Sequence, residues 1–144
     1  MKSWEKTVKA EIKYYATAGS REAVLREQLK EVEAELFKVK SLNPEQSVAS
    51  GSGKSDDRIC ALLDRKMALE SRIAAGKHRY KMIDICLTAF DSDERKILLT
   101  MCTAEYGDNI AGELAEELHI EESTVRRRWH RLMRKYKELK DSTK

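Results

Sequence analysis

The chain has 144 residues, of which 37% are charged and 41% hydrophobic, and its formal net charge is +3. One proline and six glycines disfavour a sheet, so we expect an all-α fold with almost no strand. A chain of this length can hold one ordinary domain, or a small domain beside an extended element. The net charge is too small to indicate nucleic acid by itself, and the distribution of the charges is more informative.

Several classes of protein are disfavoured. The first residues, MKSWEKTVKAEIKYY, lack the apolar core of a signal peptide, and no stretch could span a membrane, so we expect a cytoplasmic protein. Cys60, Cys86 and Cys102 are odd in number and widely spaced, which is typical of reduced thiols. No histidine lies at a zinc-binding spacing from a cysteine. Because no nucleophile elbow or catalytic pair is visible either, we expect no enzyme, metal site or cofactor.

Residues 1–86 are predicted to form an oligomerisation region built from a helical hairpin or coiled coil. Apolar residues alternate there at spacings of four and three, as in a coiled-coil seam: Leu25, Leu29, Val32, Leu36 and Val39. Trp4, Val8 and Tyr15 extend the same register, and Gly19-Ser20 is expected to break or kink the helix. The first segment is therefore one long amphipathic helix or two shorter ones.

A flexible loop is predicted at 43–56, where Pro44 and several glycines and serines exclude a regular element. The GSGKS segment at 51–55 imitates the end of a phosphate-binding loop. That motif needs a glycine where Val48 stands, and no strand precedes it. We therefore do not expect nucleotide binding.

The helical pattern resumes at Asp56 or Asp57, either of which could cap a helix. Apolar residues again follow spacings of three and four, with faults at Lys66 and Gly76: Ile59, Leu62, Leu69, Ile73, Tyr80, Ile83 and Leu87. Two matching seams favour an antiparallel hairpin whose remaining apolar surface a second copy could cover, so we expect a homodimer. The alternative is a monomer in which these helices pack onto the rest of the chain.

Residues 87–144 are predicted to form a domain of three helices. Asp91 or Ser92 would cap the first helix, which buries four residues: Ile97, Leu98, Met101 and Cys102. The second helix begins at Asp108-Asn109, and Gly112 in it would let two helices approach closely. Its inward face comprises Leu114, Ala115 and Leu118. A short turn follows from His119 to Glu122, with Ile120 in the core and Ser123 as the cap of the third helix.

The third helix has an apolar face and an arginine-rich face. The inward residues are Val125, Trp129, Leu132 and Tyr136. At about 100° per residue, the opposite arc holds the candidates for contacts to DNA bases: Ser123, Thr124, Arg127, His130, Arg131 and Arg134. Arg126 and Arg128 lie on the flanks and Lys135 further along, where phosphate contacts are more natural. The alternative is an ordinary solvated face, although its charges are almost all of one sign.

These residues also carry a resemblance. With DSDERKILLTMC at 91–102 and ELAEELHIEESTVRRR at 113–128, the segment Leu87 to Tyr136 resembles the region-four helix-turn-helix domain of bacterial sigma factors. The whole chain is similar to small phage transcriptional regulators of the RinA and ArpU type, which also place a long helical segment with a serine-rich interruption before that domain. It departs from the pattern at His119, where glycine is usual, and at Arg128, where an apolar residue is common.

The resemblance implies sequence-specific binding to double-stranded DNA by a transcriptional regulator of a phage or prophage that controls late genes. It leaves open whether RNA polymerase is contacted. Two other functions fit the same pattern of elements. One is a small terminase-like protein for DNA packaging, which would assemble into a large ring. The other is a protein-interaction module whose coiled coil binds RNA polymerase or another partner.

Overall fold

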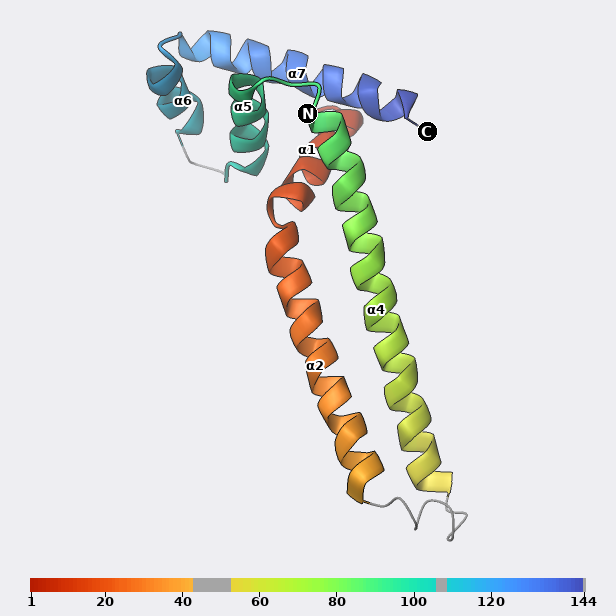
Figure 1. The fold of residues 1–144 in the computed structure, drawn as a ribbon. Coiled ribbons are helices and arrows are strands. Elements are labelled where there is room, and N and C mark those ends of the chain that lie inside the picture. The colour runs from red at the N-terminus through yellow and green to blue at the C-terminus, as the bar shows by residue number, and fades with distance from the viewer. Residues whose placement is uncertain (43–52, 106–108, 144) are drawn as a thin grey trace. The chain divides into compact units, whose positions relative to one another are not determined.

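A computed structural model of the chain describes residues 1–42, 53–105 and 109–143 (Figure 1). Regular structure in these ranges is entirely helical, which confirms the all-α prediction. The helices are α1 (Ser3–Ala16), α2 (Ala18–Leu42), α4 (Gly53–Leu87), α5 (Ser92–Thr103), α6 (Ile110–Leu118) and α7 (Glu122–Ser142). None of the described helices combines the length and the apolar character needed to cross a lipid bilayer.

The helices divide into two compact units. The hairpin unit is Gly19–His78, and the terminal unit combines Met1–Ala18 with Arg79–Lys144. A single division at residue 86 was expected. Both ends of the predicted oligomerisation region, residues 1–18 and 79–86, belong instead to the terminal unit. The physical reason is that Val8 and Ile83, from these two ends, are buried in the same core as α5, α6 and α7.

The hairpin unit is held together by the predicted seam. Its buried core consists of Val32, Leu36, Leu62 and Leu69, with further residues packed against it: Leu25, Leu29, Val39 and Ile59. Three ion pairs cross from α2 to α4: Glu22 to Lys77 at 3.6 Å, Glu33 to Lys66 at 3.8 Å and Glu35 to Arg58 at 3.8 Å. One partner's number rises as the other's falls, so the helices run antiparallel. The contacts confirm that the two apolar repeats face each other.

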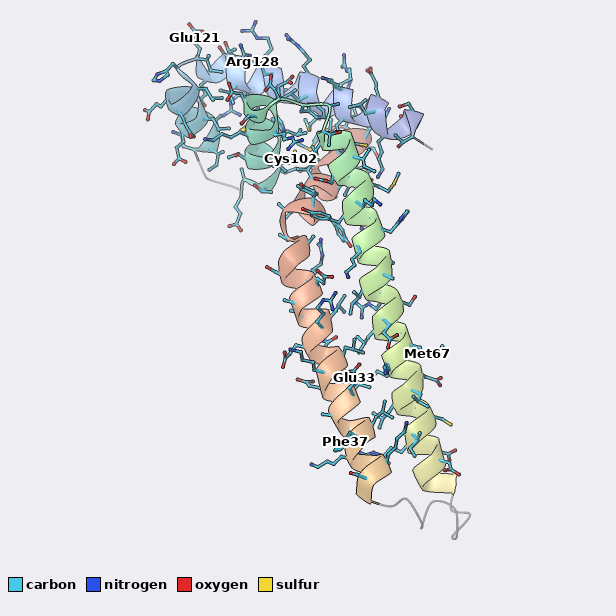
Figure 2. The ribbon with its side chains drawn as sticks, in the orientation of Figure 1. Glu33, Phe37, Met67, Cys102, Glu121 and Arg128 are labelled. Carbon is cyan, nitrogen blue, oxygen red and sulfur yellow. The ribbon has the colours of Figure 1, made fainter. Side chains whose placement is uncertain are left out.

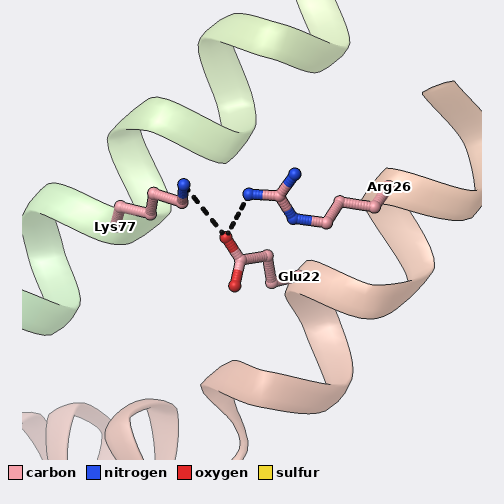
Figure 3. Close-up of polar contacts among 3 residues, drawn as sticks. All are labelled: Glu22, Arg26 and Lys77. Atoms are coloured by element: carbon pink, nitrogen blue, oxygen red, sulfur yellow. Dashed lines mark hydrogen bonds and ion pairs between the residues drawn. The ribbon is translucent and has the colours of Figure 1, made fainter.

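Figure 3 shows how charges border this seam. The Glu22 carboxylate accepts a hydrogen bond from Arg26 at 3.1 Å, one turn along α2, and lies 3.6 Å from the Lys77 ammonium on α4. Lys66, which interrupts the apolar repeat, is used in a similar way. Its ammonium lies 3.8 Å from Glu33 and 3.9 Å from Glu70. The aliphatic stem of a lysine can cover the seam while its charge stays at the surface, which explains how the fault is tolerated.

The predicted break between the first two helices is wrong. The break between α1 and α2 falls at Thr17 and not at Gly19-Ser20, which lie in the first turn of α2. The Thr17 hydroxyl donates to the Lys13 carbonyl at 2.9 Å, so a side chain satisfies the end of α1. The residues expected to extend the hairpin seam, Trp4, Val8 and Tyr15, pack instead in the core of the terminal unit.

Helix α4 begins at Gly53, three residues before the predicted cap at Asp56. Asp56 therefore lies in the first turn, where a carboxylate complements the positive end of the helix dipole. Of the loop predicted at 43–56, residues 43–52 lie outside the described residues and 53–56 belong to the helix. The first two residues of the GSGKS segment fall in the same gap, and the other three begin α4.

Two tyrosines tie α1 into the terminal unit. The Tyr15 hydroxyl donates to Asp84 at 2.7 Å, and its ring stacks on Tyr80 with centroids 4.6 Å apart. The Tyr136 hydroxyl, on α7, donates to Glu11 at 2.8 Å. Burial, together with the nearby carboxylates, raises the pKa of both phenols above its ordinary value. Both hydroxyls therefore stay protonated and remain donors at neutral pH.

Helix α5 starts with a complete capping box. The Asp91 carboxylate accepts from the Glu94 N–H at 2.8 Å, and the Asp91 N–H donates to the Glu94 carboxylate at 3.0 Å. Asp91 is thus the cap, where Asp91 and Ser92 had been alternatives. The four residues predicted to be buried on this helix, Ile97, Leu98, Met101 and Cys102, are all in the core.

Replacing the cap should weaken the terminal unit. We expect Asp91→Ala to lower the free energy of unfolding by about 1 kcal/mol, because the first turn of α5 loses a hydrogen-bond acceptor. Ser92→Ala is the matched control, since Ser92 is exposed and inside the helix. Urea denaturation followed by circular dichroism measures both. Equal losses in the two variants would contradict the assignment of the cap.

Candidate nucleic-acid interface

Helices α6 and α7 are joined by a tight turn at residues 119–121. His119 has φ 57° and ψ 43°, the left-handed conformation that glycine usually adopts at the end of a helix. The Ile120 N–H then donates to the Ala115 carbonyl at 3.0 Å, and the Ile120 side chain packs against the core. The prediction that Ile120 packs in the core after a turn that starts at His119 is confirmed. The turn changes the direction of the chain after α6 and provides hydrogen-bond donors for carbonyl groups in the last turn of that helix.

Gly112, in α6, has a different role from the predicted one. A Cβ atom at this position would lie 2.7 Å from the side-chain nitrogen of Asn109, the residue that precedes the helix. The glycine thus makes room for a side chain of its own segment, and no second helix is among its nearest neighbours. Asp108, the other residue expected at the start of this helix, lies outside the described residues.

The start of α7 also differs from expectation. Glu121 is the extended residue before the helix, and its carbonyl accepts from the N–H groups of Thr124 at 3.0 Å and Val125 at 3.1 Å. Ser123 is therefore inside the first turn and cannot be the cap, so that prediction is wrong. Among the described residues no side chain caps this end, and the acidic Glu121 and Glu122 lie there, where the helix dipole favours negative charge.

The inner face of α7 is buried in the core of the terminal unit. Val125, Trp129, Leu132 and Tyr136 are buried as predicted, and Met133, which had not been predicted, is fully buried with them. Met133 was detectable, because it follows Trp129 by four residues and precedes Tyr136 by three. The Trp129 indole donates to the Cys102 sulfur on α5 at 3.4 Å, which satisfies its buried N–H. This face therefore sets the rotation of α7 about its own axis.

The predicted contact residues lie on the rest of the helix. Thr124 is half-buried and the others are exposed: Ser123, Arg126, Arg127, Arg128, His130, Arg131, Arg134 and Lys135. Four arginines of this set form neither a hydrogen bond nor an ion pair with any described residue: Arg127, Arg128, Arg131 and Arg134. Figure 2 labels Arg128 on α7. These four, which we call the arginine face, place four uncompensated charges on about two helical turns.

Three of the remaining candidates already have partners. The Arg126 guanidinium donates to Glu122 at 3.1 Å, and both side chains are exposed, so this pair is weak. The Lys135 ammonium donates to the Ala89 carbonyl at 3.3 Å and lies 4.8 Å from the centre of the Phe90 ring. The His130 ring lies against Trp129, with centroids 5.2 Å apart. Lys135 is therefore less available to a phosphate than the sequence suggested.

No family model, curated protein or solved structure matches this chain. The exposed charge and the packing of α7 are therefore the grounds on which its role is assigned.

The three cysteines offer a test of the packing beneath α7. Cys60 is exposed, whereas Cys86 and Cys102 are buried, and burial raises the pKa of the Cys102 thiol to about 11. Since the thiolate is the reactive form, a thiol reagent at about pH 8 should label Cys60 quickly and the two buried thiols only after unfolding. Labelling in denaturant, which should reach all three, is the control. Rapid labelling of Cys102 in the folded protein would contradict the packing of Trp129 over it.

Proposed function

We propose that this chain is a sequence-specific double-stranded DNA-binding protein that regulates transcription, with α7 as its recognition helix. The observation that carries the proposal is the arginine face: four exposed guanidinium groups with no hydrogen-bond or ion-pair partner among the described residues, on a helix whose inner face is fully packed. A surface intended only for solubility would more often mix its charges. DNA phosphates and base edges supply the anions and acceptors that such a surface lacks.

The mode of contact follows from the geometry of α7. An α-helix fits the major groove, and an arginine there can donate two hydrogen bonds to the O6 and N7 atoms of guanine. Arg127, Arg131 and Arg134 follow spacings of four and three along the side opposite the buried face, so we assign them to bases. Arg128, toward one flank, is assigned to a phosphate. Ser123 and Thr124, at the uncapped start of α7, complete the surface that would approach the DNA.

The order of α5, α6 and α7 supports the resemblance to sigma factor region four. On that basis the proposal extends to a phage or prophage regulator of late genes that acts in the cytoplasm without catalysis or a cofactor. The rotation of α7 bears on one departure from the family pattern. Arg128 is exposed and Trp129 is buried, so the inward position is occupied by Trp129 in this chain.

We further propose that the hairpin unit pairs with a second copy. Phe37 is 76% exposed and Met67 is 68% exposed, which is unusual for large apolar side chains (Figure 2). Leu63 and Cys60 are also exposed and lie one and two turns before Met67, so α4 has a second apolar stripe besides its seam. Pairing would bring two recognition helices to one DNA site, which raises affinity over a single contact.

The arginine face is tested by substitution. We expect Arg127→Ala or Arg131→Ala to weaken binding to a selected duplex by about 1 to 3 kcal/mol and to relax its sequence preference. Arg65→Ala is the matched control, because this exposed arginine lies on α4 in the hairpin unit. Duplexes selected from a random pool supply the target, and fluorescence anisotropy measures affinity. Equal affinity of the unmodified protein for every duplex would refute the regulator proposal.

The pairing is tested by light scattering on a size-exclusion column. We expect the mass of two chains, and of one chain for a Leu63→Glu, Met67→Glu variant, because two buried carboxylates would oppose the contact. Lys30→Glu on α2 is the control for an added acid. An unmodified protein with the mass of one chain would refute the dimer. A large ring would instead favour the DNA-packaging function.

A further inference from the structure

Helix α1 carries a set of lysines that none of the preceding interactions uses. Lys2, Lys6, Lys9 and Lys13 follow spacings of four, three and four, so at about 100° per residue they fall within an arc of about 60°. We call these four residues the lysine stripe. Val8 and Ile12 hold the adjoining face of the helix in the core of the terminal unit. The stripe therefore has a defined direction and is not free to rotate toward the core.

The lysine stripe lacks compensating charges. In the described ranges, none of its four ammonium groups forms an ion pair or a side-chain hydrogen bond. The acid nearest to it on the same helix is Glu5, which lies between the stripe and the buried face. The other acid of α1 is Glu11, which already accepts from Tyr136 and pairs with Lys140 on the opposite side of the helix. Like the arginine face, the stripe is a row of positive charges.

The lysine stripe meets one flank of α7. A pocket of about 230 Å³ in the terminal unit is lined by Lys9 from α1 and by Arg126 from α7, with Trp129 and Met101 providing apolar walls. Glu105 also lines it, so two cations share this pocket with one carboxylate. Arg126, which pairs with Glu122 at 3.1 Å, lies on the flank of α7 opposite Arg128. The pocket therefore places one lysine of the stripe beside a flank of the proposed recognition helix.

We propose that the lysine stripe is a second DNA contact, which binds backbone phosphates beside the segment read by α7. This inference rests on the proposed function. Lysine is a flexible point charge that suits phosphates better than base edges. From Lys2 to Lys13 the stripe extends about 16 Å, a length over which each strand of a duplex presents roughly five phosphates. The hydrogen bonds from Tyr15 to Asp84 and from Tyr136 to Glu11 hold α1 in place before any DNA binds. The pocket that Lys9 shares with Arg126, a residue of the proposed recognition helix, favours DNA over an acidic protein as the partner.

The test compares salt dependence among three variants. Affinity for a selected duplex and for an unrelated duplex is measured by fluorescence anisotropy over a range of salt concentrations. In a Lys6→Gln, Lys9→Gln, Lys13→Gln variant, we expect the plot of log affinity against log salt to become less steep. The magnitude of its negative slope should decrease by about one for each lysine, equally for both duplexes. A Lys30→Gln, Lys38→Gln, Lys40→Gln variant removes the same charge from α2 and should keep the original slope. A Lys6→Arg, Lys9→Arg, Lys13→Arg variant, which keeps the charge, should also keep the original slope.

Each outcome decides one question. If the unmodified protein binds the selected duplex and the glutamine variant of α1 keeps its slope, the lysine stripe is not a DNA contact, whereas the proposed function stands. If the α1 and α2 variants lose slope equally, net charge alone acts and the inference is overturned. If the unmodified protein binds no duplex, the proposed function itself fails. Thermal unfolding by circular dichroism checks that α1 stays packed. If the triple glutamine variant unfolds, the single Lys13→Gln variant, at an exposed position, provides the same test with an expected change in slope of about one.

Discussion

The burial of one face of α7 is the constraint on which the candidate interface depends. Trp129, Met133 and Tyr136 fill the space against α5 and α1, and replacing a buried aromatic residue such as Trp129 by alanine typically costs about 3 to 5 kcal/mol. A rotation of α7 about its axis would expose these side chains and bury arginines. The apolar core therefore sets the direction of the arginine face, although no core residue would contact DNA.

The same core explains why α1 belongs with the C-terminal helices. Glu11 lies where the hydroxyl of Tyr136 needs an acceptor, and it also neutralises Lys140 at 3.9 Å. A single carboxylate thus satisfies a buried phenol and a cation from α7. The lysines on the neighbouring face of α1 have no such partner among the described residues, so one side of the helix packs in the core and another carries uncompensated positive charge. Helix α1 is therefore a structural part of the terminal unit and not only the segment that precedes the hairpin.

Periodicity predicted much of the fold and only part of the site. The seam of the hairpin and the inner face of α7 could be predicted because apolar spacing records which side of a helix is buried. It does not record which core receives that side, so Trp4 and Val8 were placed in the wrong unit. Helix ends were less predictable, because Ser123 suits a cap by type and only backbone geometry placed it in the first turn. The engagement of Lys135 depends on the α4–α5 turn, which is distant in sequence.

The left-handed backbone of His119 has a consequence for how this protein can vary. A single positive φ separates α6 from α7, and β-branched side chains tolerate that conformation poorly, whereas glycine and asparagine accept it. A residue that favours the right-handed region would encourage the two helices to run on as one. The arginines of α7 would remain in the sequence, but α7 would lose its present orientation relative to α6. The orientation of the candidate interface thus depends on the backbone of a residue that lies outside it.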